Sequence, residues 1–116
     1  MRIHHLALRV ADCDVSLAFY SRILGLREVR RTVEDGRVRS VWLEAGPTTL
    51  MLERQLRGEG ASGGSGHLLA FAVESLTEWE ARLGGAGIAV IDRTPHTLYV
   101  RDPDGHRVGL SVFSNP

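Results

Sequence analysis

Three side chains in this sequence are of types that could do chemistry together: two histidines, His5 and His67, and one carboxylate, Glu53. An imidazole changes its charge near neutral pH, so either histidine can transfer a proton or act as a neutral metal ligand. A carboxylate can act as a general base, and two histidines with one carboxylate form a ligand set for divalent metal ions. Whether the chain can use this chemistry depends on the elements that carry the three residues.

An internal repeat predicts those elements. Residues 4–12 (HHLALRVAD) match residues 67–75 (HLLAFAVES) without a gap, and apolar residues recur at every second position in both copies. This alternation is typical of a strand with one buried face. The counterpart of His5 is then Leu68, and His67 is one position out of phase. Because successive side chains of a strand point to opposite faces, we expect His67 to face away from Leu68.

Each copy continues into a helix and three strands. One helix is predicted over residues 15–24, capped by Asp12 or Asp14, and another over residues 78–83, capped by Ser75 or Thr77. The predicted strands cover residues 26–33, 37–44 and 48–54 in the first copy, and 87–94, 96–101 and 106–113 in the second. One domain over residues 1–116 therefore divides into a module over 1–57, a glycine-rich linker over 58–66 and a module over 67–116.

The composition excludes two classes of partner. The 116 residues carry 14 basic and 14 acidic side chains, and binding to nucleic acid or to an anionic membrane surface requires a basic excess. With one cysteine, Cys13, no intramolecular disulfide can form, which favours a reducing compartment. The N-terminus lacks a secretory pattern and no segment has the apolar length of a membrane span, so we expect a cytoplasmic protein.

Two stretches, HHLALRVADCDVSLAFYSRILGL and YVRDPDGHRVGL, resemble the vicinal-oxygen-chelate superfamily. That superfamily includes glyoxalase I, extradiol dioxygenases, fosfomycin-resistance enzymes and bleomycin-resistance proteins. The resemblance implies an α+β, glyoxalase-like fold: two βαβββ modules form a cupped mixed sheet with helices outside. It also implies a homodimer, a small-molecule ligand and, in the enzymes, a divalent metal ion on the cup floor that acts as a Lewis acid.

The resemblance further implies four metal-ligand positions, one on the first strand and one on the last strand of each module. In this chain those positions hold His5, Met51, Leu68 and Gly109. Leu68 and Gly109 offer no ligand atom, and the Met51 thioether is too soft for a hard divalent ion. We therefore expect no metal cofactor. A displaced site that holds Zn, Ni, Mn or Fe through His5, Glu53 and His67 is the alternative, and it requires a bulge that turns His67 inward.

We interpret the chain as a glyoxalase/bleomycin-resistance-like protein that binds or sequesters a small organic molecule, which the sequence does not identify. The alternative is a metal-dependent enzyme that resembles lactoylglutathione lyase, the dioxygenases or the fosfomycin-resistance enzymes. A third option is a metal-free isomerase with His5 and Glu53 as its acid and base. The cup can form within one chain or across a dimer. The expected ligand pocket consists of His5, Ala7, Trp42, Met51, Glu53, Leu68, Ala70, Tyr99, Gly109 and Ser111.

Overall fold

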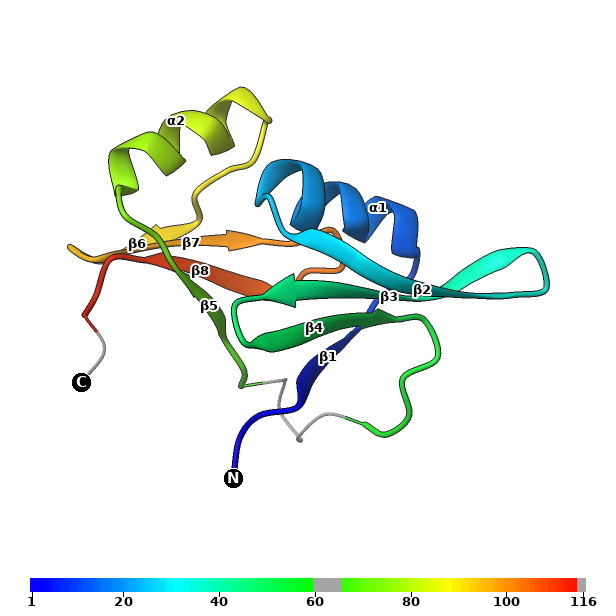
Figure 1. The fold of residues 1–116 in the computed structure, drawn as a ribbon. Coiled ribbons are helices and arrows are strands. Elements are labelled where there is room, and N and C mark those ends of the chain that lie inside the picture. The colour runs from blue at the N-terminus through cyan, green and yellow to red at the C-terminus, as the bar shows by residue number, and fades with distance from the viewer. Residues whose placement is uncertain (60–65, 115–116) are drawn as a thin grey trace. The chain divides into compact units, whose positions relative to one another are not determined.

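The computed structural model describes residues 1–59 and 66–114. The chain divides into two compact units, Met1–Glu59 and Gly60–Pro116, which we call module one and module two. Most of the predicted linker, residues 60–65, lies outside the described residues. Both modules follow the βαβββ order, so the predicted α+β fold class is confirmed (Figure 1). No helix in the described part of the chain is long and apolar enough to span a membrane.

Module one contains, in chain order, β1 (His5–Arg9), α1 (Cys13–Leu17), the π-helical segment η1 (Ala18–Ile23), β2 (Arg27–Glu34), β3 (Arg37–Ala45) and β4 (Thr48–Glu53). The strands form one sheet in the order β1-β4-β3-β2, with β1 parallel to β4 and the other pairs antiparallel. The helical stretch begins two residues earlier than predicted because Asp12 Oδ1 accepts hydrogen bonds from the backbone N–H groups of Asp14 and Val15, at 2.9 and 3.2 Å. The β2–β3 hairpin turns at Asp35 and Gly36, whose φ angles are 54° and 74°.

The core of module one lies on one face of its sheet. Alternating apolar residues of β3 and β4 are buried on this face. Helix α1 contacts both strands and lies on one side of the sheet (Figure 1). The largest buried side chains there are no more than 2 % exposed and comprise Phe19, Tyr20, Val41, Leu43, Leu50 and Leu52. The opposite face of the sheet, which we call the helix-free face, carries the intervening residues.

Module two contains β5 (Leu69–Ala72), α2 (Leu76–Gly85), β6 (Asp92–Arg93), β7 (Thr97–Arg101) and β8 (Arg107–Ser111). Its sheet has the order β5-β8-β7-β6, with β5 parallel to β8. Helix α2 starts after Ser75, whose Oγ accepts from the Glu78 N–H at 3.2 Å. The helix also continues two residues beyond the predicted end, through Gly84 and Gly85. The strand predicted over residues 87–94 shrinks to two residues, because only Asp92 and Arg93 pair with β7.

In module two, as in module one, one face of the sheet is buried and the other face carries none of the described helices (Figure 1). In module two the buried residues alternate along β7 and β8, and Leu83 of α2 is fully buried with them. Val100, Val108, Leu98 and Leu110 are at most 1 % exposed. Residues of the other parity, including Tyr99 and Gly109, form the helix-free face of module two.

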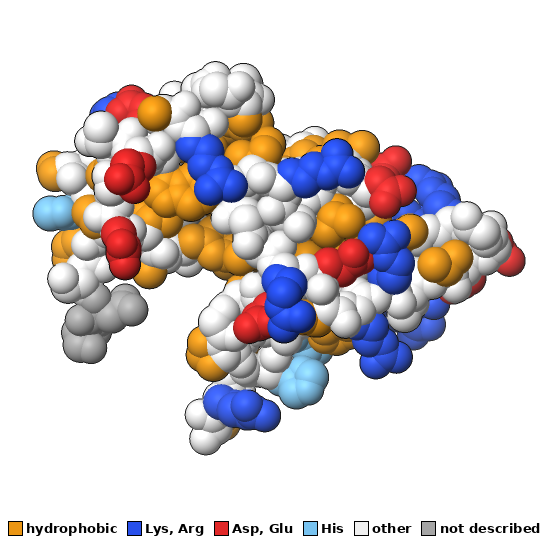
Figure 2. Space-filling view, turned by 45° about the horizontal axis from the view of Figure 1, so that its top comes forward, with side chains coloured by type: hydrophobic (Ala, Val, Ile, Leu, Met, Phe, Trp, Pro, Cys, Tyr) orange, Lys and Arg blue, Asp and Glu red, His pale blue; other side chains and the backbone are white. Residues whose placement is uncertain are grey.

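Arginines gather on the long β2–β3 hairpin, where acidic side chains pair with Arg27, Arg31 and Arg39. Figure 2 shows blue and red side chains next to one another at the end of the molecule that this hairpin forms. Arg27 pairs with Glu44, Arg31 with Glu28 at 2.6 Å, and Arg39 with Glu34 at 2.8 Å. Such exposed pairs add at most about 1 kcal/mol each to stability. The hairpin is therefore a solvated surface of paired charges.

Candidate functional site

The register of module one places its predicted site residues on the helix-free face. On this face of β1 and β4, Ala7 lies directly beside Met51, and Trp42 of β3 lies on the other side of Met51. His5 lies beside Thr49, one step diagonal to Met51, and Glu53 lies beside Arg9 at the far end of β4. The five residues thus share a face but spread along the whole length of the strands.

His5 is held by two aromatic neighbours. Its ring centroid lies 5.1 Å from that of Trp42, and its Nδ1 lies 2.8 Å from the Nδ1 of His4. One of these two nitrogens must donate the proton and the other must accept it, so the two imidazoles hold complementary tautomers while both are neutral. His5 is exposed, so its ring also remains accessible to solvent.

Glu53 is 5 % exposed, and hydrogen bonds hold its carboxylate to β3 and to the residues that follow β4. Its Oε1 accepts from the Arg39 Nε at 3.2 Å and from the Gln55 backbone N–H at 3.0 Å. The hydrogen bonds from Arg39 to Glu34 and Glu53 raise the pKa of the guanidinium. His5 and Glu53 lie beside Thr49 and Arg9, four strand positions apart, which corresponds to about 13 Å. One metal ion with ligand bonds of about 2 Å cannot bind both side chains in this arrangement, and no proton can pass between them directly.

On module two, Gly109 lies between Ala70 of β5 and Tyr99 of β7. A Cβ atom at Gly109 would meet Ala70 Cβ and Thr97 Cγ2 at 3.4 Å and Tyr99 Cε1 at 3.6 Å. Ser111, two residues further along β8, accepts a hydrogen bond from Thr97 Oγ1 at 2.8 Å. The position that the resemblance assigns to a metal-binding carboxylate therefore has no side chain, although a Cβ there would make only ordinary van der Waals contacts.

A pocket of about 380 Å³ opens on module two, lined by Gly66, His67, Leu68, Tyr99, Arg101 and Arg107. Leu68 and Tyr99 were predicted to line a pocket, whereas the two arginines were not. The alternation of strand side chains could have placed them on the same face as Tyr99 and Gly109, because Arg101 follows Tyr99 by two residues and Arg107 precedes Gly109 by two. His67 and Leu68 line this pocket together, against the expectation that they face apart. Strand β5 begins only at Leu69, so the alternation of strand side chains does not extend to residues 67 and 68.

The charged groups of this pocket are only partly paired. Arg107 Cζ lies 4.4 Å from the centroid of the Tyr99 ring, and its Nη2 donates to Asp92 Oδ2 at 2.9 Å. The Arg107 Nε is buried and has no hydrogen-bond partner among the described residues. Arg101 donates from Nη1 to the Gly105 carbonyl at 3.0 Å. The pocket therefore offers two cationic side chains beside one carboxylate.

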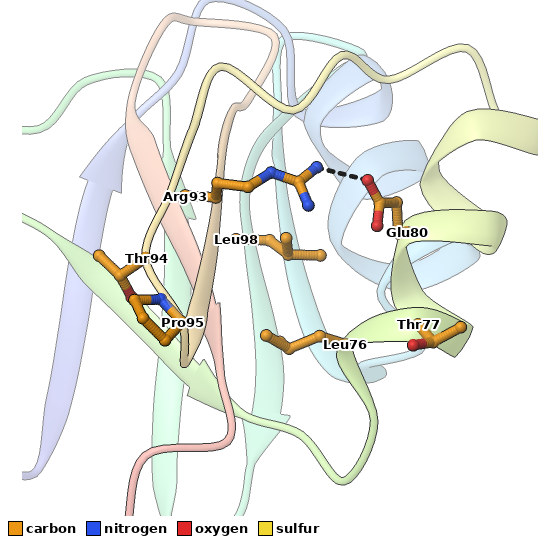
Figure 3. A pocket seen from close by; sticks show the side chains of 7 residues that line it. All are labelled: Leu76, Thr77, Glu80, Arg93, Thr94, Pro95 and Leu98. Carbon is orange, nitrogen blue, oxygen red and sulfur yellow. Dashed lines mark hydrogen bonds and ion pairs between the residues drawn. The ribbon is translucent and has the colours of Figure 1, made fainter.

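A second cavity, of about 520 Å³, lies on the helix side of module two, between α2 and the β6–β7 hairpin (Figure 3). Its lining residues are Leu76, Thr77, Glu80, Arg93, Thr94, Pro95 and Leu98. Arg93 pairs with Glu80 across the opening, and this hydrogen bond lowers the pKa of Glu80 and raises that of Arg93. The two charges satisfy each other, and the cavity also presents the apolar side chains of Leu76, Pro95 and Leu98.

The residues that stand at the expected metal positions do not fit a divalent ion. A thioether at Met51, an isobutyl group at Leu68 and a hydrogen at Gly109 leave His5 as the one conventional ligand of the four. Within either module, the described residues contain no group of three His, Cys, Asp or Glu side chains that could hold a metal ion.

Comparisons with known proteins agree with this fold. The chain is 26 % identical over 122 residues to the metallothiol transferase FosB of Bacillus licheniformis, which covers 97 % of the chain and 75 % of FosB. A lactoylglutathione lyase from Agrobacterium tumefaciens has a similar structure, with a TM-score of 0.70, 26 % identity, and 95 % of this chain and 92 % of the other covered. TnmS3, an antibiotic binding protein from Streptomyces sp. CB03234, shares the fold with a TM-score of 0.73 and 21 % identity over 96 % of this chain and 94 % of its own. The profile of one family matches residues 2–110. This chain therefore belongs to the Glyoxalase/Bleomycin resistance protein/Dioxygenase superfamily.

Proposed function

We propose that the protein binds a small organic molecule on the helix-free face of its sheets, without a divalent metal ion at the positions that the resemblance assigns to one. Gly109 carries this proposal. Glycine offers no ligand atom at the place that the resemblance assigns to a carboxylate. A Cβ there would lie in van der Waals contact with Ala70 and Thr97, 3.4 Å from their carbon atoms, so the ligand is missing because of the residue type and not for lack of space.

The pocket of module two supports a binding role. Its volume of about 380 Å³ falls in the range of small-molecule sites, which span roughly 300–1,000 Å³. Leu68 supplies apolar surface, while Arg101 and Arg107 supply a few directed hydrogen-bond donors. Apolar walls with a small number of polar groups are the usual composition of a ligand site.

Module one gives little support to the enzyme alternatives. A site built on His5, Glu53 and His67 would need His5 and Glu53 to approach each other, and the strand register holds them about 13 Å apart. Glu53 also has its Oε1 engaged by Arg39 and Gln55, so a metal ion would compete with two existing hydrogen bonds. The same separation weakens the option of an acid–base pair.

Metal content and binding in the presence of a chelator test the proposal. We expect purified protein to contain no stoichiometric metal by elemental analysis. Calorimetric titrations with nickel, zinc, manganese and ferrous ions should not differ between wild type and His5→Ala. Naphthalene-2-sulfonamide, a neutral aromatic probe, should bind in the presence of EDTA.

Tight one-to-one metal binding that is lost in His5→Ala would overturn the proposal. His96→Ala is the matched control, because His96 is an exposed histidine of module two whose ring packs on Phe113 at 5.2 Å. A metal effect common to both variants would reflect general histidine affinity rather than a site, and would leave the proposal standing.

A further inference from the structure

The pocket of module two brings together two like charges, which one described carboxylate, Asp92, neutralises only in part. Arg101 of β7 and Arg107 of β8 are directly opposite each other in the antiparallel ladder. Like charges at directly opposed positions are destabilising, because their side chains leave the sheet from neighbouring points on the same face. Both side chains also line the same pocket, so the two charges share one enclosed space.

The neighbouring carboxylates do not neutralise both arginines. Asp92 pairs with Arg107 through Nη2, at 2.9 Å. Asp102 lies next to Arg101 in sequence, but it is buried and its Oδ1 accepts from the backbone N–H groups of Asp104 and His106, at 2.9 and 2.8 Å. Arg101 thus keeps a full charge at the pocket, where its Nη1 donates to the backbone carbonyl of Gly105.

Arg107 is in addition preorganised for a further hydrogen bond. The Cζ of its guanidinium lies over the Tyr99 ring, 4.4 Å from the ring centroid, and Asp92 anchors the group on one side. Its Nε is buried and lacks a partner among the described residues, and a buried donor without an acceptor is costly. A planar guanidinium in a fixed position matches the geometry of an oxyanion.

We propose that this pocket binds the oxyanionic group of an organic molecule, such as a carboxylate, sulfonate, phosphate or phosphonate. Donors of Arg101 and Arg107 that Gly105 and Asp92 leave unused hold the oxyanion, and the apolar part of the molecule lies against Leu68. An anion in this place offsets the repulsion between the two arginines. This inference rests on the proposed small-molecule function and specifies the class of ligand.

A matched pair of probes tests the charge requirement: naphthalene-2-sulfonate, which is an anion, and naphthalene-2-sulfonamide, which is neutral and nearly the same size. Calorimetry in EDTA should show that wild type binds the sulfonate at least about tenfold more tightly, as expected for one charge-assisted hydrogen bond. The difference should shrink as salt is added, because mobile ions screen exposed charges.

Variants then place the effect at this pocket. Arg101→Gln and Arg107→Gln should each reduce sulfonate affinity about tenfold and leave sulfonamide affinity nearly unchanged. Arg107→Lys keeps the charge without the planar fork and should fall between wild type and Arg107→Gln. Arg27→Gln, on β2 of module one, removes the same charge from a different surface and should have no effect. Circular dichroism checks that each variant is folded.

Three outcomes would overturn the inference. Equal affinity for sulfonate and sulfonamide would remove the anion site but leave small-molecule binding intact. A loss in Arg27→Gln as large as in Arg107→Gln would show that net charge, not this pocket, attracts the anion. No binding of either probe at millimolar concentration would remove both the inference and the binding role proposed for this pocket.

Discussion

At the scale of single residues, neighbouring groups decide what each reactive side chain can do. Glu53 and Cys13 are both buried in module one, yet neither is free to react: Glu53 is engaged by Arg39 and Gln55, and the Cys13 Sγ donates toward the carbonyls of Arg39 and Leu52 at 3.4 and 3.8 Å. Glu53 is a candidate metal ligand or base by residue type, and its contacts instead tie two adjacent segments of the sheet together.

Cys13 provides a test through pH. Burial raises the pKa of its thiol, so the folded chain keeps the proton at a pH where the unfolded chain has lost it. The unfolded state then binds fewer protons, and the free energy of unfolding falls as pH rises through about 8.5, the usual thiol pKa. Urea unfolding at about pH 7 and about pH 9.5 should show that wild type loses more stability than Cys13→Ala. An unchanged gap between the two proteins would contradict a buried, protonated thiol.

At the scale of elements, local signals place both helices well. Asp12 and Ser75, each one of two predicted candidates, cap α1 and α2. The short side chain of each residue carries an oxygen that accepts a hydrogen bond from the free N–H groups of the first helical turn. The helix C-termini are less readable, since a run of glycines permits several end points. In α2 the chain passes through Gly84 and Gly85 in helical conformation, and Gly87 takes the positive φ of 74°.

Two substitutions in α2 test this assignment. A Cβ at either Gly84 or Gly87 would meet no atom within 4 Å, so the two positions differ in backbone conformation rather than in space. Gly84→Ala should raise the free energy of unfolding by about 0.5–1 kcal/mol, because alanine is the better helix former. Gly87→Ala should lower it by about 1–2 kcal/mol, because the left-handed region disfavours a Cβ. Thermal and urea unfolding measure both, and shifts of the same sign would disprove the assigned helix end.

At the scale of the whole molecule, each sheet ends in strands that pair on one side only within the described chain. These are β1 and β2 in module one and β5 and β6 in module two. Exposed apolar residues lie on the edge strands of module one: Leu6 is 41 % exposed on β1, and Val33 is 60 % exposed on β2. Unpaired strand edges with apolar side chains tend to associate with another chain.

We therefore expect a homodimer, as the resemblance also implies. Sedimentation equilibrium at micromolar concentrations should give twice the mass of one chain, and a dilution series should show whether the mass falls to that of one chain. A single-chain mass at every concentration up to the millimolar range would contradict the expectation.

The sequence by itself determined the family and the order of the elements. Alternating apolar residues, capping side chains and the Asp35-Gly36 turn act over a few residues, so they can be read without knowing what lies elsewhere in the chain. The resemblance placed Met51 and Gly109 on the expected cup floor, whereas the sequence left the side of the sheet that Tyr99 faces open. The alternation rule did not predict the direction of the His67 side chain, because strand β5 begins only at Leu69.

The tertiary structure decided which side chains meet. The stacking of Arg107 on Tyr99, its pairing with Asp92 and its opposition to Arg101 join residues from β6, β7 and β8, and they depend on a register between strands. The pocket of α2 and the β6–β7 hairpin likewise needs a helix and a hairpin to be brought together. Such contacts form between segments that are distant in the sequence, so a local sequence pattern does not predict them. For this reason the sequence predicted a cavity floor, and only the fold showed that Arg107 meets Tyr99, Asp92 and Arg101 there.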